Sequence, residues 1–91
     1  MKRLFVWGTL RHNGVNNPFF LVNAKLVNKN FVFEDASEDY MKIGDVYEVG
    51  EGEFAAIHRF EGGFNYVLKY TEKYNFYYYV GAEVSPTGMW I

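Results

Sequence analysis

The first residues in this sequence that could do chemistry form the glycine turn Gly8-Thr9-Leu10. A glycine directly after a buried strand lets the backbone turn sharply and present successive N–H groups, which can hold a carboxylate or stabilise an oxyanion. The motif is not specific, because many strands end in a glycine turn that has no function.

The second candidate is Glu61, which lies between Phe60 and the stretch Gly62-Gly63-Phe64. Apolar neighbours can desolvate such a carboxyl group and raise its pKa toward a value useful for a general base. The alternative interpretation is a surface glutamate near a helix end. His58 precedes Glu61 by one helical turn, which favours a local hydrogen bond or solvent exposure over a catalytic dyad.

Other chemistries are excluded by what the sequence lacks. There is no cysteine, and His12 and His58 have no companion at metal-ligand spacing, so we predict neither a disulfide nor a metal site. No serine or cysteine has a nucleophile-elbow context. No glycine-rich phosphate loop ending in Lys-Ser or Lys-Thr occurs.

The elements that position the two candidates belong to one domain, because 91 residues suffice for a single unit over residues 1–91. Residues 2–7 predict a central strand that is apolar on both faces. Asn17-Pro18 predicts the start of a short helix, with the Asn17 side chain as its cap. Residues 24–33 predict strand structure on both sides of a hairpin turn at Asn28-Lys29-Asn30, and residues 34–39 predict a solvated acidic loop.

The second half of the chain predicts a strand, a helix and a hairpin. Residues 40–49 alternate, which favours a strand with one mainly apolar face that holds Met41 and Ile43. Residues 54–61 predict a two-turn helix that ends at Gly62-Gly63 and places Glu61 on its last turn. Residues 65–72 and 76–84 predict a final hairpin, followed by a tail over 85–91. We therefore expect an α+β fold with five to six strands, one or two short helices and a sheet curled or closed into a small β-barrel.

Charge and hydropathy limit the partners and the location. The net charge is −2 and the basic residues are scattered, which disfavours binding to nucleic acid. The aromatic residues 76–79 could stack on bases, but with few nearby cations we interpret them as core. The apolar stretch near the N-terminus ends after four residues at Gly8, too short for a signal peptide or a membrane span, so we expect a cytoplasmic protein.

Several segments together resemble the γ-glutamylcyclotransferase-like family, and the resemblance covers nearly the whole chain. The most specific are the first-strand signature, which in the family is usually a tyrosine followed by Gly-Ser/Thr-Leu, and a later helix that ends in Phe-Glu-Gly. The segments concerned are Phe5-Val6-Trp7-Gly8-Thr9-Leu10-Arg11, Asn17-Pro18-Phe19-Phe20, Ile43-Gly44-Asp45-Val46-Tyr47-Glu48-Val49, Ala55-Ala56-Ile57-His58-Arg59-Phe60-Glu61-Gly62, Tyr66 and Phe76-Tyr77-Tyr78-Tyr79-Val80.

The resemblance implies a small barrel whose cavity takes a γ-glutamyl group and releases 5-oxoproline and a free amine, without a cofactor. It implies that Glu61 is the catalytic glutamate. It also implies substrate-binding roles for Trp7, Gly8, Thr9, Leu10 and Tyr66. The partner implied is a small γ-glutamyl compound, and the sequence leaves both the leaving amine and the oligomeric state open.

Two other functions remain open at this stage. Trp7 stands where the family has a tyrosine and Leu68 where an arginine is often found, so the chain could be a non-catalytic barrel that binds a small metabolite or nucleotide. The many aromatic residues could also serve a protein-interaction module.

Overall fold

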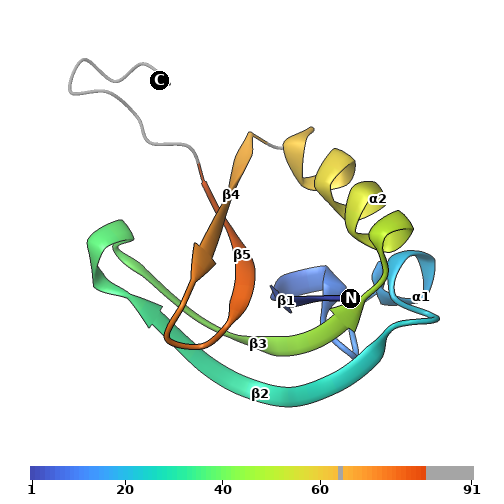
Figure 1. Cartoon of the computed structure of the whole chain (residues 1–91), viewed down its shortest axis with the longest axis horizontal. Helices are drawn as coiled ribbons and strands as arrows, with labels where there is room; N and C mark the ends of the chain where they lie inside the picture. The colour runs from blue at the N-terminus through green and yellow to red at the C-terminus, as the bar shows by residue number, and fades with distance from the viewer. Residues whose placement is uncertain (64, 82–91) are drawn as a thin grey trace.

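The computed structural model describes residues 1–63 and 65–81 of the chain. The described part is an α+β fold with five strands, two α-helices and two short 3-10 helices (Figure 1). The strands are β1 (Lys2–Val6), β2 (Lys25–Asp35), β3 (Tyr40–Val49), β4 (Tyr66–Thr71) and β5 (Phe76–Gly81), the helices are α1 (Asn17–Phe20) and α2 (Glu51–Gly62), and the 3-10 helices cover Gly8–Leu10 and Ala36–Glu38.

The five strands form one mixed sheet in the order β2-β3-β1-β5-β4. The pairs β1–β3, β2–β3 and β4–β5 are antiparallel, whereas β1 and β5 run parallel. The central position predicted for the first strand is confirmed. Leu4, Phe5 and Val6 are all buried, as expected for a strand covered on both faces.

Alternation along β1 divides the core into two clusters. Leu4 and Val6 point to the face that α1 and α2 cover, where they pack with Ile57 of α2. Phe5 points to the opposite face and packs with Phe33, Phe76 and further buried residues of the sheet itself. The end of β1 therefore lies between a helical layer and an aromatic layer.

The sheet is strongly curved but is not closed, so the prediction of a barrel is wrong. Its edge strands are β2 and β4, which form no ladder with each other. Aromatic rings fill the concave side instead: Phe33 of β2 lies 4.9 Å from Phe76 and 4.7 Å from Tyr78 of β5, between ring centroids. Figure 1 shows β2 and β3 as long arcs that bend around this side. Side-chain packing thus holds the curvature where a closed barrel would use hydrogen bonds.

The prediction of a hairpin turn at residues 28–30 is wrong, because β2 continues through these residues as one strand. The ladder with β3 shifts register between Leu26 and Asn28 and again between Asn28 and Phe31, as in a β-bulge. Asn30 has the positive φ of 56°, typical of a turn. The loop predicted at 34–39 is also shorter than expected, because β2 extends to Asp35 and a 3-10 helix follows.

Most other boundaries lie close to the prediction. β3 has the predicted bounds. Met41 and Ile43 are 65% and 49% exposed, so the prediction that they belong to a buried apolar face is wrong. The α2 helix begins at Glu51, three residues before the predicted start. There Glu53 Oε1 accepts a hydrogen bond of 2.9 Å from Gly50 N–H. The predicted tail and the end of the last predicted strand fall on residues 82–91, outside the described residues.

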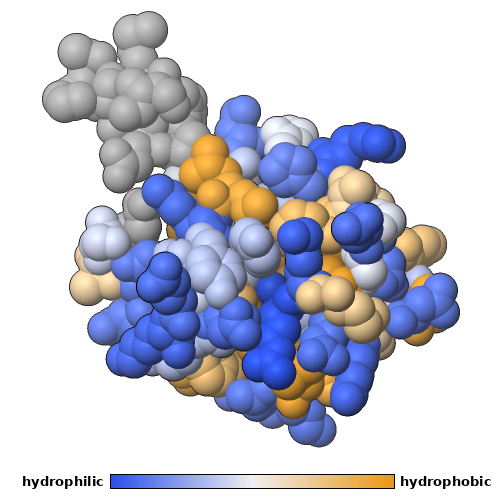
Figure 2. Space-filling model, viewed as in Figure 1, coloured by the Kyte–Doolittle hydropathy of each residue, from blue (hydrophilic) through white to orange (hydrophobic). Residues whose placement is uncertain are grey.

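On the face seen in Figure 2, hydrophilic residues predominate and hydrophobic residues form separate small areas. Within residues 1–63 and 65–81, no helix has both the length and the hydropathy needed to cross a membrane.

Candidate functional site

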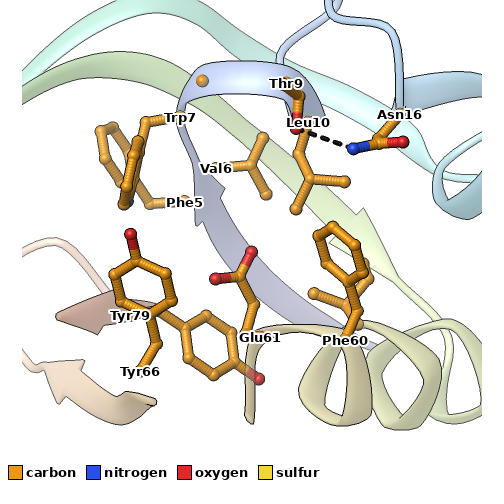
Figure 3. Close-up of a pocket in the computed structure, with 12 residues that line it drawn as sticks. Phe5, Val6, Trp7, Thr9, Leu10, Asn16, Phe60, Glu61, Tyr66 and Tyr79 are labelled. Atoms are coloured by element: carbon orange, nitrogen blue, oxygen red, sulfur yellow. Dashed lines mark hydrogen bonds between the residues drawn. The ribbon is translucent and has the colours of Figure 1, made fainter. Parts of the chain in front are cut away.

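The six residues proposed from the sequence line one cavity of about 360 Å³. It lies between the end of β1, the 3-10 turn that follows, the last turn of α2 and the hairpin β4–β5 (Figure 3). Trp7, Gly8, Thr9 and Leu10 come from the first strand and turn, Glu61 from α2 and Tyr66 from β4. The other lining residues are Phe5, Val6, Asn16, Ile57, Phe60 and Tyr79.

The wall after β1 is a turn of 3-10 helix over Gly8–Leu10. Gly8 has a φ of +65°, a conformation that favours glycine and explains why this residue type follows the strand. The turn closes through the Arg11 N–H, which donates to Gly8 O at 3.2 Å. The first N–H groups of a helical turn have no partner within it, so Gly8, Thr9 and Leu10 can present donors to a ligand.

Two asparagines of the next segment hold this turn. Asn16 donates from its backbone to Thr9 O at 2.9 Å and from Nδ2 to Thr9 Oγ1 at 3.0 Å. Asn17 donates from Nδ2 to Leu10 O at 2.9 Å and to Tyr47 Oη at 3.0 Å. Asn17 is the first residue of α1 and not its cap, which corrects the predicted role of its side chain.

A buried carboxylate anchors the segment that follows the turn. Asp45 of β3 is fully buried and accepts hydrogen bonds from the backbone N–H groups of His12 and Asn30, at 2.7 and 3.0 Å. The Arg11 guanidinium lies 3.7 Å from Asp45 Oδ1, the oxygen that accepts from Asn30. One acidic residue thereby ties the segment after Gly8 to the bulge of β2.

Glu61 is half-buried on the last turn of α2, and its carboxylate points into the cavity toward the end of β1 (Figure 3). Burial raises the pKa of the Glu61 carboxyl above its ordinary value. No basic side chain among the described residues forms an ion pair with it. A carboxyl group in this setting is suited to accept and return a proton.

Aromatic side chains shape the rest of the cavity. Trp7 and Tyr66 meet edge to face, with centroids 5.6 Å apart. The Tyr79 hydroxyl forms a hydrogen bond with His58, whose Nδ1 lies 3.0 Å away. Burial, and next the nearby Glu61 carboxylate, raises the pKa of Tyr79 above its ordinary value. His58 itself is exposed, as one of the two interpretations of the sequence expected, but its hydrogen-bond partner is the distant Tyr79 and not a neighbour on α2.

Two polar residues of the cavity were missed from the sequence. Tyr79 belongs to the aromatic stretch interpreted as core. The alternation of a strand could have separated it from Tyr78, which faces the other core cluster. Asn16 had no sequence signal of its own, because its role depends on how the turn after β1 folds back.

The lining residues include one carboxylate, Glu61, and no lysine, arginine or histidine. In the part of the chain that the structure describes, no three His, Cys, Asp or Glu side chains gather as metal ligands. The donors that these lining residues offer to negative charge on a ligand are the backbone N–H groups of the turn and neutral side chains such as Trp7, Tyr66 and Tyr79.

Comparisons with known proteins agree with the fold. No protein-family model and no curated protein matches the chain. The fold is similar to the crystal structure of the uncharacterized protein PH0828 from Pyrococcus horikoshii, with a TM-score of 0.65 and 25% sequence identity. The match covers 100% of this chain and 86% of that protein. This similarity supports the small α+β fold.

Proposed function

We propose that this protein is a γ-glutamylcyclotransferase-type enzyme that releases 5-oxoproline from a γ-glutamyl amine or γ-glutamyl amino compound. One observation supports this most directly: Glu61 and the turn Gly8–Leu10, some fifty residues apart in the chain, line the same cavity. The resemblance of the sequence to the γ-glutamylcyclotransferase-like family supplies the reaction. A cytoplasmic location is part of the proposal.

Glu61 serves as the acid and base of the proposed reaction. Its carboxylate takes a proton from the α-ammonium group of the substrate, and the freed amine attacks the γ-carbonyl carbon. A new C–N bond closes the five-membered ring, and the bond from the γ-carbonyl carbon to the leaving amine breaks. The α-nitrogen loses two protons, one before the attack and one after the new C–N bond has formed. Glu61 passes each in turn to the leaving nitrogen, which departs as an ammonium group.

The raised pKa of Glu61 suits this double role, because a carboxyl group protonates a leaving amine more readily as its pKa approaches the working pH. The N–H groups of the turn stabilise negative charge on the substrate. The attack is intramolecular, so holding the γ-glutamyl chain folded contributes several kcal/mol and no enzyme nucleophile is required.

The test is an assay for 5-oxoproline with a panel of γ-glutamyl compounds. We expect product from the wild type. Glu61→Gln, which keeps the size of the side chain, should lower kcat/KM by about a hundredfold to ten-thousandfold, the usual contribution of a general acid and base. Glu72→Gln is the matched control, because Glu72 is exposed in the β4–β5 turn outside the cavity.

Two results would contradict the proposal. Product formation that survives Glu61→Gln would remove Glu61 from its role. No product from any compound, together with binding of a metabolite or nucleotide in the cavity, would make the protein a non-catalytic binding protein instead.

A further inference from the structure

His58 and Tyr79 connect the surface of α2 to the candidate active site. The imidazole Nδ1 of His58 lies 3.0 Å from the Tyr79 hydroxyl oxygen, and the two ring centroids are 6.0 Å apart. His58 is exposed, whereas Tyr79 is 4% exposed and lines the cavity. The proposed reaction as described so far uses neither side chain, so it leaves this hydrogen bond without a role.

The Tyr79 hydroxyl carries one proton, which it can donate in one direction at a time. If Tyr79 donates to His58 Nδ1, the lone pairs of its oxygen remain available to the cavity. If His58 donates instead, the Tyr79 proton turns into the cavity. Among the described residues His58 is the hydrogen-bond partner of this hydroxyl, and no hydrogen bond joins Tyr79 to Glu61. The state of the His58 ring therefore decides which group Tyr79 presents to a ligand.

Glu61 lies within electrostatic range of the Tyr79 hydroxyl. Its carboxylate is in the same cavity, beside the rings of Tyr66 and Tyr79 (Figure 3). Burial, and next the Glu61 charge, raises the pKa of Tyr79. His58 and Glu61 are three residues apart in α2, at neighbouring helical positions. A Tyr79 proton that turns into the cavity is therefore attracted to the carboxylate that must take a proton from the substrate.

Few other titratable groups face this pair of side chains. Glu61 and Tyr66 share the cavity, and α1, which packs on α2, carries no titratable side chain. Lys69 of β4 alternates with the residues that face the cavity and lies on the opposite side of the sheet. Arg59 is exposed beside His58 on α2. The environment of the Tyr79 hydroxyl thus depends mainly on the histidine and the glutamate.

Charged groups farther along the sheet lie outside the cavity. Lys2 of β1 contacts an aromatic ring of α2 one helical turn before His58. Lys42 of β3 lines a second hollow of about 330 Å³. Trp7 and Tyr66 line both hollows, so this pair of rings forms the boundary between them.

We propose that His58 is a positioning residue that sets the direction of the Tyr79 hydroxyl and thereby controls whether Glu61 is free to act as a base. The inference rests on the proposed function. Neutral His58 accepts a hydrogen bond from Tyr79, whose oxygen then accepts one from the α-ammonium group of the substrate beside Glu61. Protonated His58 donates to Tyr79, whose proton turns to the Glu61 carboxylate and competes there with the substrate.

This control makes the reaction sensitive to mild acid. Histidine is the side chain that ordinarily gains its charge as the pH falls from about 8 to 5. His58 is exposed and exchanges protons with solvent, although the base that it controls is half-buried. The proposal therefore predicts that kcat/KM falls in mild acid by more than the protonation of Glu61 alone would cause.

The kinetic test measures kcat/KM for 5-oxoproline formation between pH 5.5 and pH 8. His58→Asn keeps an uncharged acceptor near the position of Nδ1, so it should stay close to the wild type at pH 8. At pH 5.5 it should exceed the wild type by about tenfold, because an ordinary histidine is about nine-tenths protonated there. His58→Leu has no polar atom to accept from Tyr79, so it should be about tenfold slower than the wild type at pH 8.

Two further variants show whether His58 acts through Tyr79. Arg59→Gln is the matched control, because it removes a positive charge from an exposed position of the same helix that does not line the cavity, and it should keep the wild-type pH profile. In a Tyr79→Phe background, His58→Asn and His58→Leu should have the same pH profile, because the hydroxyl that they affect is gone.

An NMR measurement tests the direction of the hydrogen bond without a substrate. The ring nitrogen signals of His58, assigned with His58→Asn, report which nitrogen carries the proton. At pH 8 we expect Nδ1 to be unprotonated and Nε2 to carry the proton, because Nδ1 accepts from Tyr79. Tyr79→Phe should change the balance between the two neutral forms of the ring.

Each contrary outcome overturns a defined statement. A protonated Nδ1 at pH 8, or one pH profile shared by the wild type and both His58 variants, refutes the positioning role while the proposed function stands. A rise of kcat/KM in acid that is lost in His58→Asn would make Tyr79 a proton donor to the substrate, against our proposal. If no γ-glutamyl compound gives 5-oxoproline, the proposed function fails, and the role of His58 fails with it whichever nitrogen carries the proton.

Discussion

The backbone N–H and the ring Nδ1 of His12 both lie 2.7 Å from one oxygen, Oδ2, of the buried Asp45. An ionised carboxylate only accepts hydrogen bonds, so the ring nitrogen that faces it carries a proton. Burial alone would raise the pKa of Asp45, but the hydrogen bonds from His12 and Asn30 outweigh burial and hold it below its ordinary value. The pair connects β3 to the segment that follows the Gly8 turn.

Asp45→Asn should lower the free energy of unfolding by about 1–3 kcal/mol at neutral pH, because the amide replaces one acceptor oxygen with a donor. The pKa of Asp45 is depressed on folding, so its contribution is present above the ordinary value of 3.8 and is lost as the pH falls below it. Thermal unfolding from pH 7 to pH 2.5 should show the gap between variant and wild type narrowing in acid. A gap that stays constant over this range would contradict the assignment.

Glu61→Gln should have the opposite pH dependence. Because burial raises the pKa of Glu61, its ionised form is disfavoured in the folded protein, and stability is lost as the pH rises from the ordinary value of 4.5 through the raised one. The variant should therefore melt at a higher temperature than wild type at pH 7, with the difference vanishing below pH about 4. Glu72→Gln, measured in parallel, should show little difference at either pH.

Gly44 should tolerate no side chain. A Cβ there would lie 2.2 Å from Val6 O and 2.7 Å from Cζ of Phe5, both parts of the packed centre of the sheet. Gly44→Ala should lower the free energy of unfolding in urea by about 1–3 kcal/mol or more, as overpacking does. Gly52→Ala is the control in α2, where a Cβ meets nothing within 4 Å, and it should raise stability by about 0.5–1 kcal/mol.

Phe33→Ala should remove the ring that links the edge of the sheet to β5. We expect a loss of about 3–5 kcal/mol, because Phe33 is buried among Phe76, Tyr78 and Tyr40. The neighbouring Val32 is 62% exposed, so Val32→Ala should change urea unfolding by less than about 1 kcal/mol. Similar losses in both variants would show that aromatic packing does not hold the curvature of the sheet.

Local pattern predicted most of the elements in this fold. The apolar run before Gly8, the alternation of residues 40–49 and the spacing of Phe54, Ile57 and Phe60 each produced a strand or helix near the expected bounds. These signals depend on neighbours in sequence, which a single chain reveals. The placing of Glu61 against the Gly8 turn came from the family resemblance, and the structure brings both to one cavity.

What the sequence did not predict depends on contacts between distant residues. Asn30 has the backbone of a turn, but its N–H donates to Asp45, so the chain continues as a bulged strand instead of reversing. Whether a curved sheet closes depends on how its edges meet, and alternation within each strand carries no information on that. The surroundings of the Tyr40 side chain could not be predicted either, because they come from three other strands or their ends.

The ring pair Trp7 and Tyr66 has a thermodynamic consequence, because its two rings belong to two hollows at once. A ligand that fixes the orientation of either ring from one hollow would also change the shape of the other hollow. Linkage requires such an effect to be reciprocal, so a ligand in either hollow would alter the affinity of the other hollow for its own ligand by the same factor. Measured together, the two occupants would behave as cooperative ligands in a chain of only 91 residues.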